Sequence, residues 1–344
     1  MNRIVIIGNG FDLAHGLKTS YNHFILDYLK NALDLALQNW TYEDSLLKIE
    51  RKNNSPITQL LEVEFPSELF QRSKILDFRY TFKSIFWKSC FHELEQLNWV
   101  DIENLYYQFL LQLLSVSNKN NVTQLNKEFD SIRQLLIQYL KKVNAQLIVD
   151  SKQKKEIINL ITDGINPYEI SNFYKEGIVI NFNYTDTLKY YERDLNYFNF
   201  EIVNIHGDTN NPDSVIFGYG DELDAKYSEI ENLNENVFFT HIKSFMYLKT
   251  NNYKKIFEMI NRDKFEVQVY GHSIGTSDRT LFSQIVNHEN LDNIKLFYHQ
   301  KNEIENDFVT KTHELSRHFK DKGKMRLQIV PFESSVPMPQ RFMK

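Results

Sequence analysis

Residues 4–21 read IVIIGNGFDLAHGLKTSY, and this stretch decides the fold class. Four β-branched residues run directly into a turn that contains Gly8 and Gly10, and apolar residues then recur at helical spacing. A buried strand, a glycine turn and a helix in this order are typical of the first unit of a parallel α/β sheet. We therefore expect an α/β fold whose first strand covers residues 3–7.

The glycine turn itself suggests an anion site. Glycines let a phosphate approach the backbone, and the first turn of a helix offers oriented N–H groups. The dinucleotide fingerprint G-x-G-x-x-G nevertheless fails, because Leu13 stands at its third glycine position. The pattern is instead Gly8-x-Gly10 followed by Gly16, for which a tight turn without any ligand is an equally good interpretation.

The remainder of the chain divides by its periodicity. Apolar spacing is helical between the first strand and about residue 172, whereas short apolar runs alternate with helical stretches after residue 178. We expect a Rossmann-like domain built from residues 1–21 and 173–335, a helical insertion at 22–172, and an irregular tail at 336–344.

Several individual elements are predicted in the same way. One long helix with an aromatic face is expected at 73–97, and another at 123–151 with Thr123 as its cap. The aromatic residues at 78–91 predict a core or an oligomer contact. The runs SVIFGYG at 214–220 and LQIVPF at 327–332 are predicted as strands.

Composition excludes several classes of protein. The formal net charge of −5 and the pI of about 6.1 make nucleic acid an unlikely main partner. The single cysteine, Cys90, excludes a disulfide framework and a multi-cysteine zinc site within the chain. Apolar runs such as FLLQLL at 109–114 are too short to cross a membrane, and no secretory signal is predicted. We expect a cytoplasmic protein with no membrane segment.

Polar residues follow the predicted strands, at the edge of a parallel sheet where ligands collect. Asn183 offers both a donor and an acceptor to a ribose or an amide, and His206 is a candidate general base. The alternatives are a helix cap at Asn183, or at Asp186, and a structural histidine bonded to backbone at His206.

A third cluster follows the run VQVY, and its members are Gly271, His272, Ser273 and Asp278. The glycine and the serine suit a ribose or a phosphate, whereas Asp278 also suits a helix cap. The acidic loop at 217–224 is predicted as a solvated turn rather than a metal site. A resemblance to two-metal phosphoesterases is weak, because Gly10 stands where a histidine ligand is expected, so no metal ligands are predicted.

Four stretches resemble sirtuins and occur in the sirtuin order. GNGFD at 8–12 with Gly16 resembles the sirtuin loop G-A-G-I-S…S-G-I-P, and FNYTD at 182–186 resembles T-Q-N-I-D or T-N-Y-D. NIHGD at 204–208 resembles L-H-G, and YGHSIGTSD at 270–278 resembles the later G-[TY]-S strand end. The resemblance implies a sirtuin-type parallel sheet that binds NAD.

Over nearly its full length the chain resembles the bacterial abortive-infection AbiH family. The stretches that carry this resemblance are IGNGFDLAHGLKTSYNHF at 7–24, WVDIE at 99–103, NFNYTDTL at 181–188, IHGD at 205–208, FGYGDE at 217–222 and YGHSIGTSDRTL at 270–281. Membership implies a role in defence against phage, by halting or killing the infected cell.

Together the two resemblances imply hydrolysis of NAD to nicotinamide and ADP-ribose. Asn183 would position a ribose or a water, and His206 would act as the base. The residues implied in NAD binding are Gly8, Asn9, Gly10, Phe11, Asp12, Asp186, Gly271 and Ser273. A four-cysteine zinc module is impossible with one cysteine, so deacetylation and a structural zinc are not expected.

Asp12 departs from the sirtuin pattern, in which a serine occupies this position. A carboxylate facing a pyrophosphate is repulsive, so Asp12 is expected to hold a ribose hydroxyl, a metal or the loop itself. Two other functions stay open: a non-catalytic nucleotide sensor, whose helical insertion contacts a second copy or a defence partner, and a metal-dependent phosphodiesterase or nuclease. In the insertion, Trp99, Asp101 and Glu103 suit either a lid over the ligand or the start of a helix.

Overall fold

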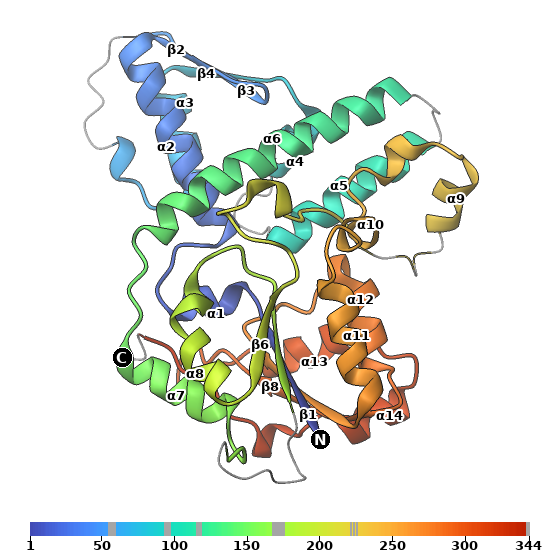
Figure 1. The fold of residues 1–344 in the computed structure, drawn as a ribbon. Helices are drawn as coiled ribbons and strands as arrows, with labels where there is room; N and C mark the ends of the chain where they lie inside the picture. The colour runs from blue at the N-terminus through green and yellow to red at the C-terminus, as the bar shows by residue number, and fades with distance from the viewer. Residues whose placement is uncertain are drawn as a thin grey trace. The chain divides into compact units, whose positions relative to one another are not determined.

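A computed structural model describes residues 1–53, 60–92, 98–114, 119–166, 176–220, 222, 224 and 226–341 (Figure 1). The chain divides into two units. The first, which we call the sheet unit, consists of Met1–Leu17, Leu140–Tyr227 and Ile242–Lys344. The second, the helical unit, consists of Lys18–Tyr139 and Ser228–His241.

The sheet unit is built around a parallel sheet. Its described strands are β1 (Asn2–Ile7), β5 (Gly177–Asn181), β6 (Phe200–Asn204), β7 (Phe265–Tyr270) and β8 (Leu291–Phe297). They lie in the order β6-β5-β1-β7-β8, and every neighbouring pair is parallel. The predicted α/β class with a parallel sheet is therefore confirmed. The chain adds strands on one side of β1 and then crosses to the other, so the topological switch point lies between β1 and β7.

Side chains of β1 alternate between two hydrophobic clusters, one on each face of the sheet. Ile4 and Ile6 belong to one cluster, and Val5 and Ile7 to the other. The helices that contribute to the first include α11 (Asn252–Arg262), α12 (Arg279–Val286) and α13 (Phe308–Ser316), with α14 (Lys322–Gln328) against its margin. Those that contribute to the second are α1 (Asn9–Ala14), α7 (Ser151–Ile161) and α8 (Glu192–Tyr197) (Figure 1). Burial on both faces explains why residues 4–7 of β1 are all apolar rather than alternating.

The helical unit also contains strands. Its helices are α2 (Tyr21–Asn39), α3 (Pro66–Ile75), α4 (Ile85–His92), α5 (Trp99–Leu114), α9 (Tyr227–Asn232) and α6 (Lys119–Asn144) as far as Tyr139. Its strands are β2 (Thr41–Glu43), β3 (Leu47–Arg51) and β4 (Phe78–Phe82), which form an antiparallel sheet in the order β2-β3-β4. Among the described residues, no helix is long and apolar enough to cross a membrane.

The predicted long helix at 73–97 is wrong. The structure has the end of α3, then β4, then α4, and residues 93–97 lie outside the described part of the chain. Asp77 takes a left-handed backbone with φ of 60°, which stops α3. The alternation of FRYTF then suits a strand, and β4 pairs with β3 from Arg51↔Phe78 to Leu47↔Phe82.

Three smaller predictions also need correction. Thr123 does not cap a helix, because α6 begins at Lys119 and the Thr123 hydroxyl donates to the Lys119 carbonyl inside it. The run at 214–220 begins with the last residue of the short helix η3 (Pro212–Ser214) and then makes a single bridge, from Tyr219 to Ile242, so it adds no strand to the sheet. The run at 327–332 begins inside α14 and contributes only one bridge, from Ile329 to Ile294.

The two units do not have the bounds predicted for the insertion, 22–172. Ile157, Ile158 and Ile161 of α7 pack into the cluster on one face of the parallel sheet, and α7 therefore belongs to the sheet unit. Their spacing of three and four residues is that of an amphipathic helix in either place, so periodicity alone does not assign α7 to a unit.

Candidate active site at the strand ends

The loops that follow β1 and β7 contact each other backbone to backbone at the switch point. The Gly10 N–H donates to the Gly271 carbonyl over 2.8 Å, and the Gly8 N–H donates to the Tyr270 carbonyl over 3.0 Å. A Cβ atom on Gly8 would lie 2.5 Å from the His272 Cα, and one on Gly271 would lie 2.1 Å from the Phe11 nitrogen. Gly271 also has a φ of +66°. The contact between the two loops thus explains why glycines stand here.

This contact occupies the N–H groups expected to face a phosphate. In addition to the Gly8 and Gly10 donors, the Phe11 N–H donates to the Gly8 carbonyl over 2.8 Å. In this conformation these amides make internal hydrogen bonds. Ser273 is exposed, and Asn9, Gly10 and Gly271 are half-buried, so these four residues of the two loops remain accessible to solvent.

Asp12 holds the β1 loop to the loop that follows β5. Its Oδ2 accepts a hydrogen bond of 2.6 Å from the Thr185 hydroxyl, and its Oδ1 accepts one of 2.7 Å from the Thr187 hydroxyl. Burial raises the pKa of Asp12 to about 6, although the hydrogen bonds from its polar neighbours act in the opposite direction. Of the roles considered for Asp12, the observed one is to hold the loop itself.

Asn183 makes a second link between the same two loops. Its Nδ2 donates to the Gly8 carbonyl over 3.0 Å, and its backbone N–H donates to Asn181 Oδ1 over 3.0 Å. Asp186 lies apart from these contacts, since its carboxylate pairs with Lys189 at 2.8 Å and accepts from Asn210 at 3.0 Å. Asn183 is therefore part of the strand-end site, whereas Asp186 belongs to a neighbouring surface network.

A cluster of buried polar side chains surrounds His206, two residues beyond the end of β6. His206 Nε2 lies 3.2 Å from Asp278 Oδ1 and 3.2 Å from the Tyr247 hydroxyl. Lys243 Nζ donates to the same Asp278 oxygen over 2.8 Å, and His272 Nε2 lies 3.7 Å from Asp278 Oδ2. None of these five side chains belongs to a residue more than 5% exposed. We call this set the buried charge cluster.

The cluster contains one ion pair and two neutral imidazoles at neutral pH. Burial alone would raise the pKa of Asp278, but the Lys243 ammonium and His206 more than reverse this and hold it well below its usual range. Burial and then the Lys243 charge lower the pKa of His206, and burial lowers that of His272 to about 3. The Ile274 N–H donates to His272 Nδ1, which places the ring proton of neutral His272 on Nε2, toward Asp278.

The family model of bacteriophage abortive infection AbiH matches residues 4–300. The chain belongs to the AbiH family. The match includes both loops at the switch point and the whole buried charge cluster, and it confirms the AbiH resemblance carried by the sequence motifs. No curated protein sequence matches the chain.

Two members of the cluster in this AbiH-family chain were not singled out from the sequence. Lys243 and Tyr247 lie on α10 (Lys243–Tyr247), which follows no strand and carries no glycine turn. Asp278 ends the short helix η5 (Thr276–Asp278) and was considered mainly as a cap, but its side chain makes no capping hydrogen bond to α12. A lysine in the apolar run HIKSFMY was the available signal, because buried lysines require a partner.

A further lysine supports the cluster from α13. Lys311 Nζ donates to the His272 carbonyl over 2.8 Å and lies 3.4 Å from Asp307 Oδ2. The described residues bring together no three His, Cys, Asp or Glu side chains in an arrangement that could hold a metal ion. The chemistry that this AbiH-family site offers is proton transfer at a neutral histidine beside a carboxylate and a phenol.

The WVDIE stretch begins α5 within the helical unit. Asp101 Oδ2 accepts a hydrogen bond of 2.7 Å from the Asn98 N–H, and Trp99 Nε1 donates to the Thr19 carbonyl over 2.9 Å. Trp99 also contacts the rings of Tyr21 and Phe24, with centroids 5.3 Å away in each case. These contacts confirm the helix-start interpretation.

Proposed function

We propose that this chain acts in phage defence by abortive infection, and that the strand-end site hydrolyses NAD. The family match supports the first part. The observation that carries the second is the placement of His206, which is buried beside Asp278 and Tyr247 where parallel strands present ligands. The sirtuin-like order of the surrounding loops points to NAD rather than to another nucleotide.

In the proposed reaction, the bond between the nicotinamide nitrogen and the ribose C1′ breaks, and a water oxygen bonds to C1′. The nitrogen keeps the electron pair, so nicotinamide leaves neutral. The water proton passes to His206, whose lowered pKa keeps the ring neutral and ready to accept it near pH 7. The Asp278 carboxylate stabilises the imidazolium that results, and ADP-ribose is the second product.

Access to His206 requires movement of a loop. The side chains around it are buried, and the amides of Gly8, Gly10 and Phe11 are bonded within the protein. We propose that the loops after β1 and β7 separate when NAD binds, which exposes both the amides and His206. Asn9 and Ser273, at the margin of these loops, would meet the ligand first.

Infected cells provide the first test. Cells that express the chain should lose NAD and release fewer phage after infection, whereas cells that express His206→Ala should retain NAD and lose protection. His313→Ala is the matched control, because His313 is exposed on α13. Protection that persists in His206→Ala cells, with NAD unchanged in both, would overturn the proposed chemistry and leave the defence role standing.

A non-catalytic nucleotide sensor is the second candidate function. It is favoured by the closed site, in which the loop amides and the Asp278 carboxylate already have partners within the protein. Calorimetry with NAD separates the two candidates. Binding without nicotinamide release supports the sensor, and release that depends on His206 supports the hydrolase.

A further inference from the structure

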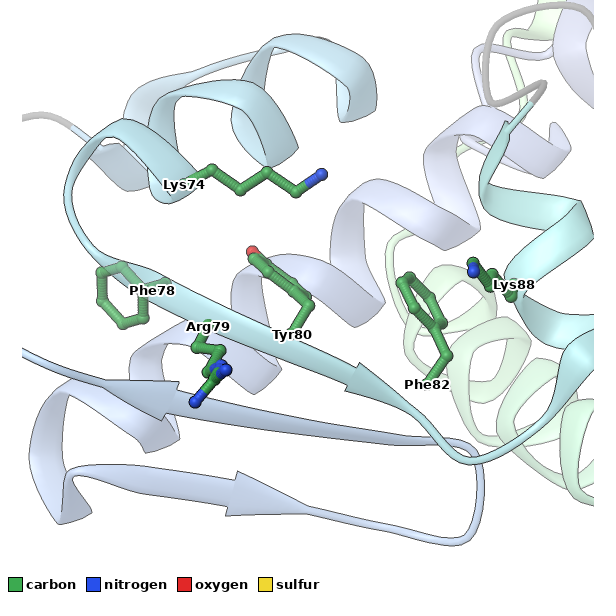
Figure 2. A pocket seen from close by; sticks show the side chains of 6 residues that line it. All are labelled: Lys74, Phe78, Arg79, Tyr80, Phe82 and Lys88. Atoms are coloured by element: carbon green, nitrogen blue, oxygen red, sulfur yellow. The ribbon is translucent and has the colours of Figure 1, made fainter.

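A pocket of about 450 Å³ opens beside strand β4 in the helical unit. It is lined by Lys74 near the end of α3, by Phe78, Arg79, Tyr80 and Phe82 of β4, and by Lys88 of α4 (Figure 2). β4 is at the edge of its sheet. The pocket lies in the aromatic stretch that the sequence assigned to a core or to an oligomer contact, and it shares no residue with the strand-end site.

Aromatic rings form one wall of the pocket. Phe78, Tyr80 and Phe82 alternate along β4, so their side chains leave the same side of the strand (Figure 2). Phe70 packs edge-on against Tyr80 with centroids 4.7 Å apart, and Phe91 packs against Phe82 at 5.2 Å. The Tyr80 hydroxyl is also hydrogen-bonded to Ser73. These contacts fix the positions of the Tyr80 and Phe82 rings, which remain half-buried.

Three cations line the pocket: Lys74 and Lys88 on the neighbouring helices, and Arg79, which leaves the opposite side of β4 from the rings (Figure 2). Lys74, Arg79 and Lys88 are exposed, and over the described ranges none of them has a carboxylate within ion-pairing distance. Among the described residues, the acid opposite Arg79 on the neighbouring strand is engaged elsewhere. Glu50, the cross-strand neighbour of Arg79, pairs with Lys48 at 3.3 Å and Lys52 at 3.6 Å. The pocket therefore concentrates positive charge in a chain whose net charge is −5.

We infer that this pocket binds a nucleobase together with its phosphate. Aromatic side chains stack on any base, and lysine or arginine side chains beside them bind the phosphate. The volume of about 450 Å³ lies within the ordinary range for small-ligand sites. The same chemistry is presented by a free mononucleotide and by one unit of a single-stranded nucleic acid, and the test separates these two sources.

Four probes test the inference by titration of the full chain: AMP, ribose 5-phosphate, adenosine and a short oligo(dT) strand. AMP or oligo(dT) should bind more tightly than ribose 5-phosphate and adenosine by about tenfold, because only the first two supply both a base and a phosphodiester or monoester. Tighter binding of AMP identifies a free nucleotide as the source. Tighter binding of oligo(dT), with an affinity that falls steeply with salt, identifies a nucleic acid strand.

Paired variants locate the binding. Lys74→Gln/Lys88→Gln should weaken binding by about tenfold, since it removes two of the three cations. Lys18→Gln/Lys127→Gln makes the same charge change at exposed lysines of the helical unit outside the pocket and should bind as wild type. Tyr80→Leu should weaken binding by about tenfold, and Tyr80→Phe, which keeps the ring, should not.

Three results would overturn the inference. The first is no binding of AMP or oligo(dT) by a chain that unfolds cooperatively. The second is binding of both AMP and oligo(dT) that is no tighter than that of ribose 5-phosphate, or capture of an acidic peptide in preference to both nucleotide probes. The third is nucleotide binding that survives in Lys74→Gln/Lys88→Gln and Tyr80→Leu. The last would place the ligand elsewhere, and none of the three bears on whether His206 is needed for NAD loss.

Discussion

Two buried aspartates illustrate how local surroundings set the charge of a residue. Asp12 accepts hydrogen bonds from neutral hydroxyls and has a raised pKa of about 6, because burial dominates. Asp278 is equally buried, but the ammonium of Lys243 beside it lowers its pKa well below the usual range. Asp12 therefore connects two loops and titrates near neutral pH, whereas Asp278 stays an anion beside His206.

Asp12 makes stability depend on pH in a defined direction. Its folded-state pKa of about 6 exceeds the ordinary aspartate value of 3.8, so the folded state binds the proton more tightly. The contribution of this proton to the free energy of unfolding is fully present below pH ~4. It is lost as the pH rises through about 6, so the free energy of unfolding is lower by about 3 kcal/mol at pH 7. Asp12→Asn cannot titrate, so its unfolding free energy should lack this fall.

Urea unfolding at pH 4.5 and pH 7 gives the free energy of unfolding of the wild type and of Asp12→Asn. Subtracting the values for the two proteins at each pH removes the contributions of the other titrating groups, which both proteins share. Asp292→Asn, at an exposed position of β8, is the matched control and should follow the wild type. Parallel pH profiles for wild type and Asp12→Asn would contradict the assignment of a raised pKa to Asp12.

At the scale of elements, a few side-chain and backbone contacts join segments that lie far apart in sequence. The glycines join the ends of β1 and β7, and Asp12 joins the β1 loop to the β5 loop. Lys243 of α10 and Asp278, which precedes α12, form the link between those two helices. The motifs GNGFD, FNYTD and YGHSIGTSD, which belong to the stretches that resemble the AbiH family, thus coincide with contacts between elements of the sheet unit.

The link between α10 and α12 predicts a large coupling. Asp278→Asn leaves the Lys243 ammonium buried without an anion and should lower the unfolding free energy by about 3–5 kcal/mol. Lys243→Met leaves the Asp278 carboxylate buried without its cation and should lower the unfolding free energy by a similar amount. The double variant Asp278→Asn/Lys243→Met should recover much of the loss, as measured by a double-mutant cycle of urea unfolding. Strictly additive losses would show that the two side chains are not an energetic pair.

Sequence reasoning predicted elements well where a short apolar run is followed by a glycine or a polar residue. The first strand and its glycine turn, β5 with Asn183, β6 with His206 and β7 with Gly271 all lie where their apolar runs end. It failed where the apolar periodicity fits either a helix or a strand. The predicted helix at 73–97 included FRYTF, although the aromatic residues of this segment alternate as in a strand. It also missed Lys243 and Tyr247, because nothing in local spacing reveals which buried carboxylate or imidazole a side chain will meet.

At the scale of the whole molecule, the two units carry separate chemistry. The sheet unit holds the buried charge cluster, and the helical unit holds the pocket lined with aromatic rings and cations. Variants at His206 and at Lys74/Lys88 therefore report on different proposals. Loss of NAD turnover without loss of AMP binding, or the reverse, assigns each activity to one unit.

The most direct test of the central claim follows nicotinamide release from NAD by the full chain purified from phage-infected cells. We expect release of nicotinamide and ADP-ribose in equal amounts, with the rate lowered by about 100-fold or more in His206→Ala and unchanged in His313→Ala. Release of nicotinamide by His206→Ala at the wild-type rate, or wild-type protein that protects cells and leaves NAD intact, would contradict NAD hydrolysis at His206.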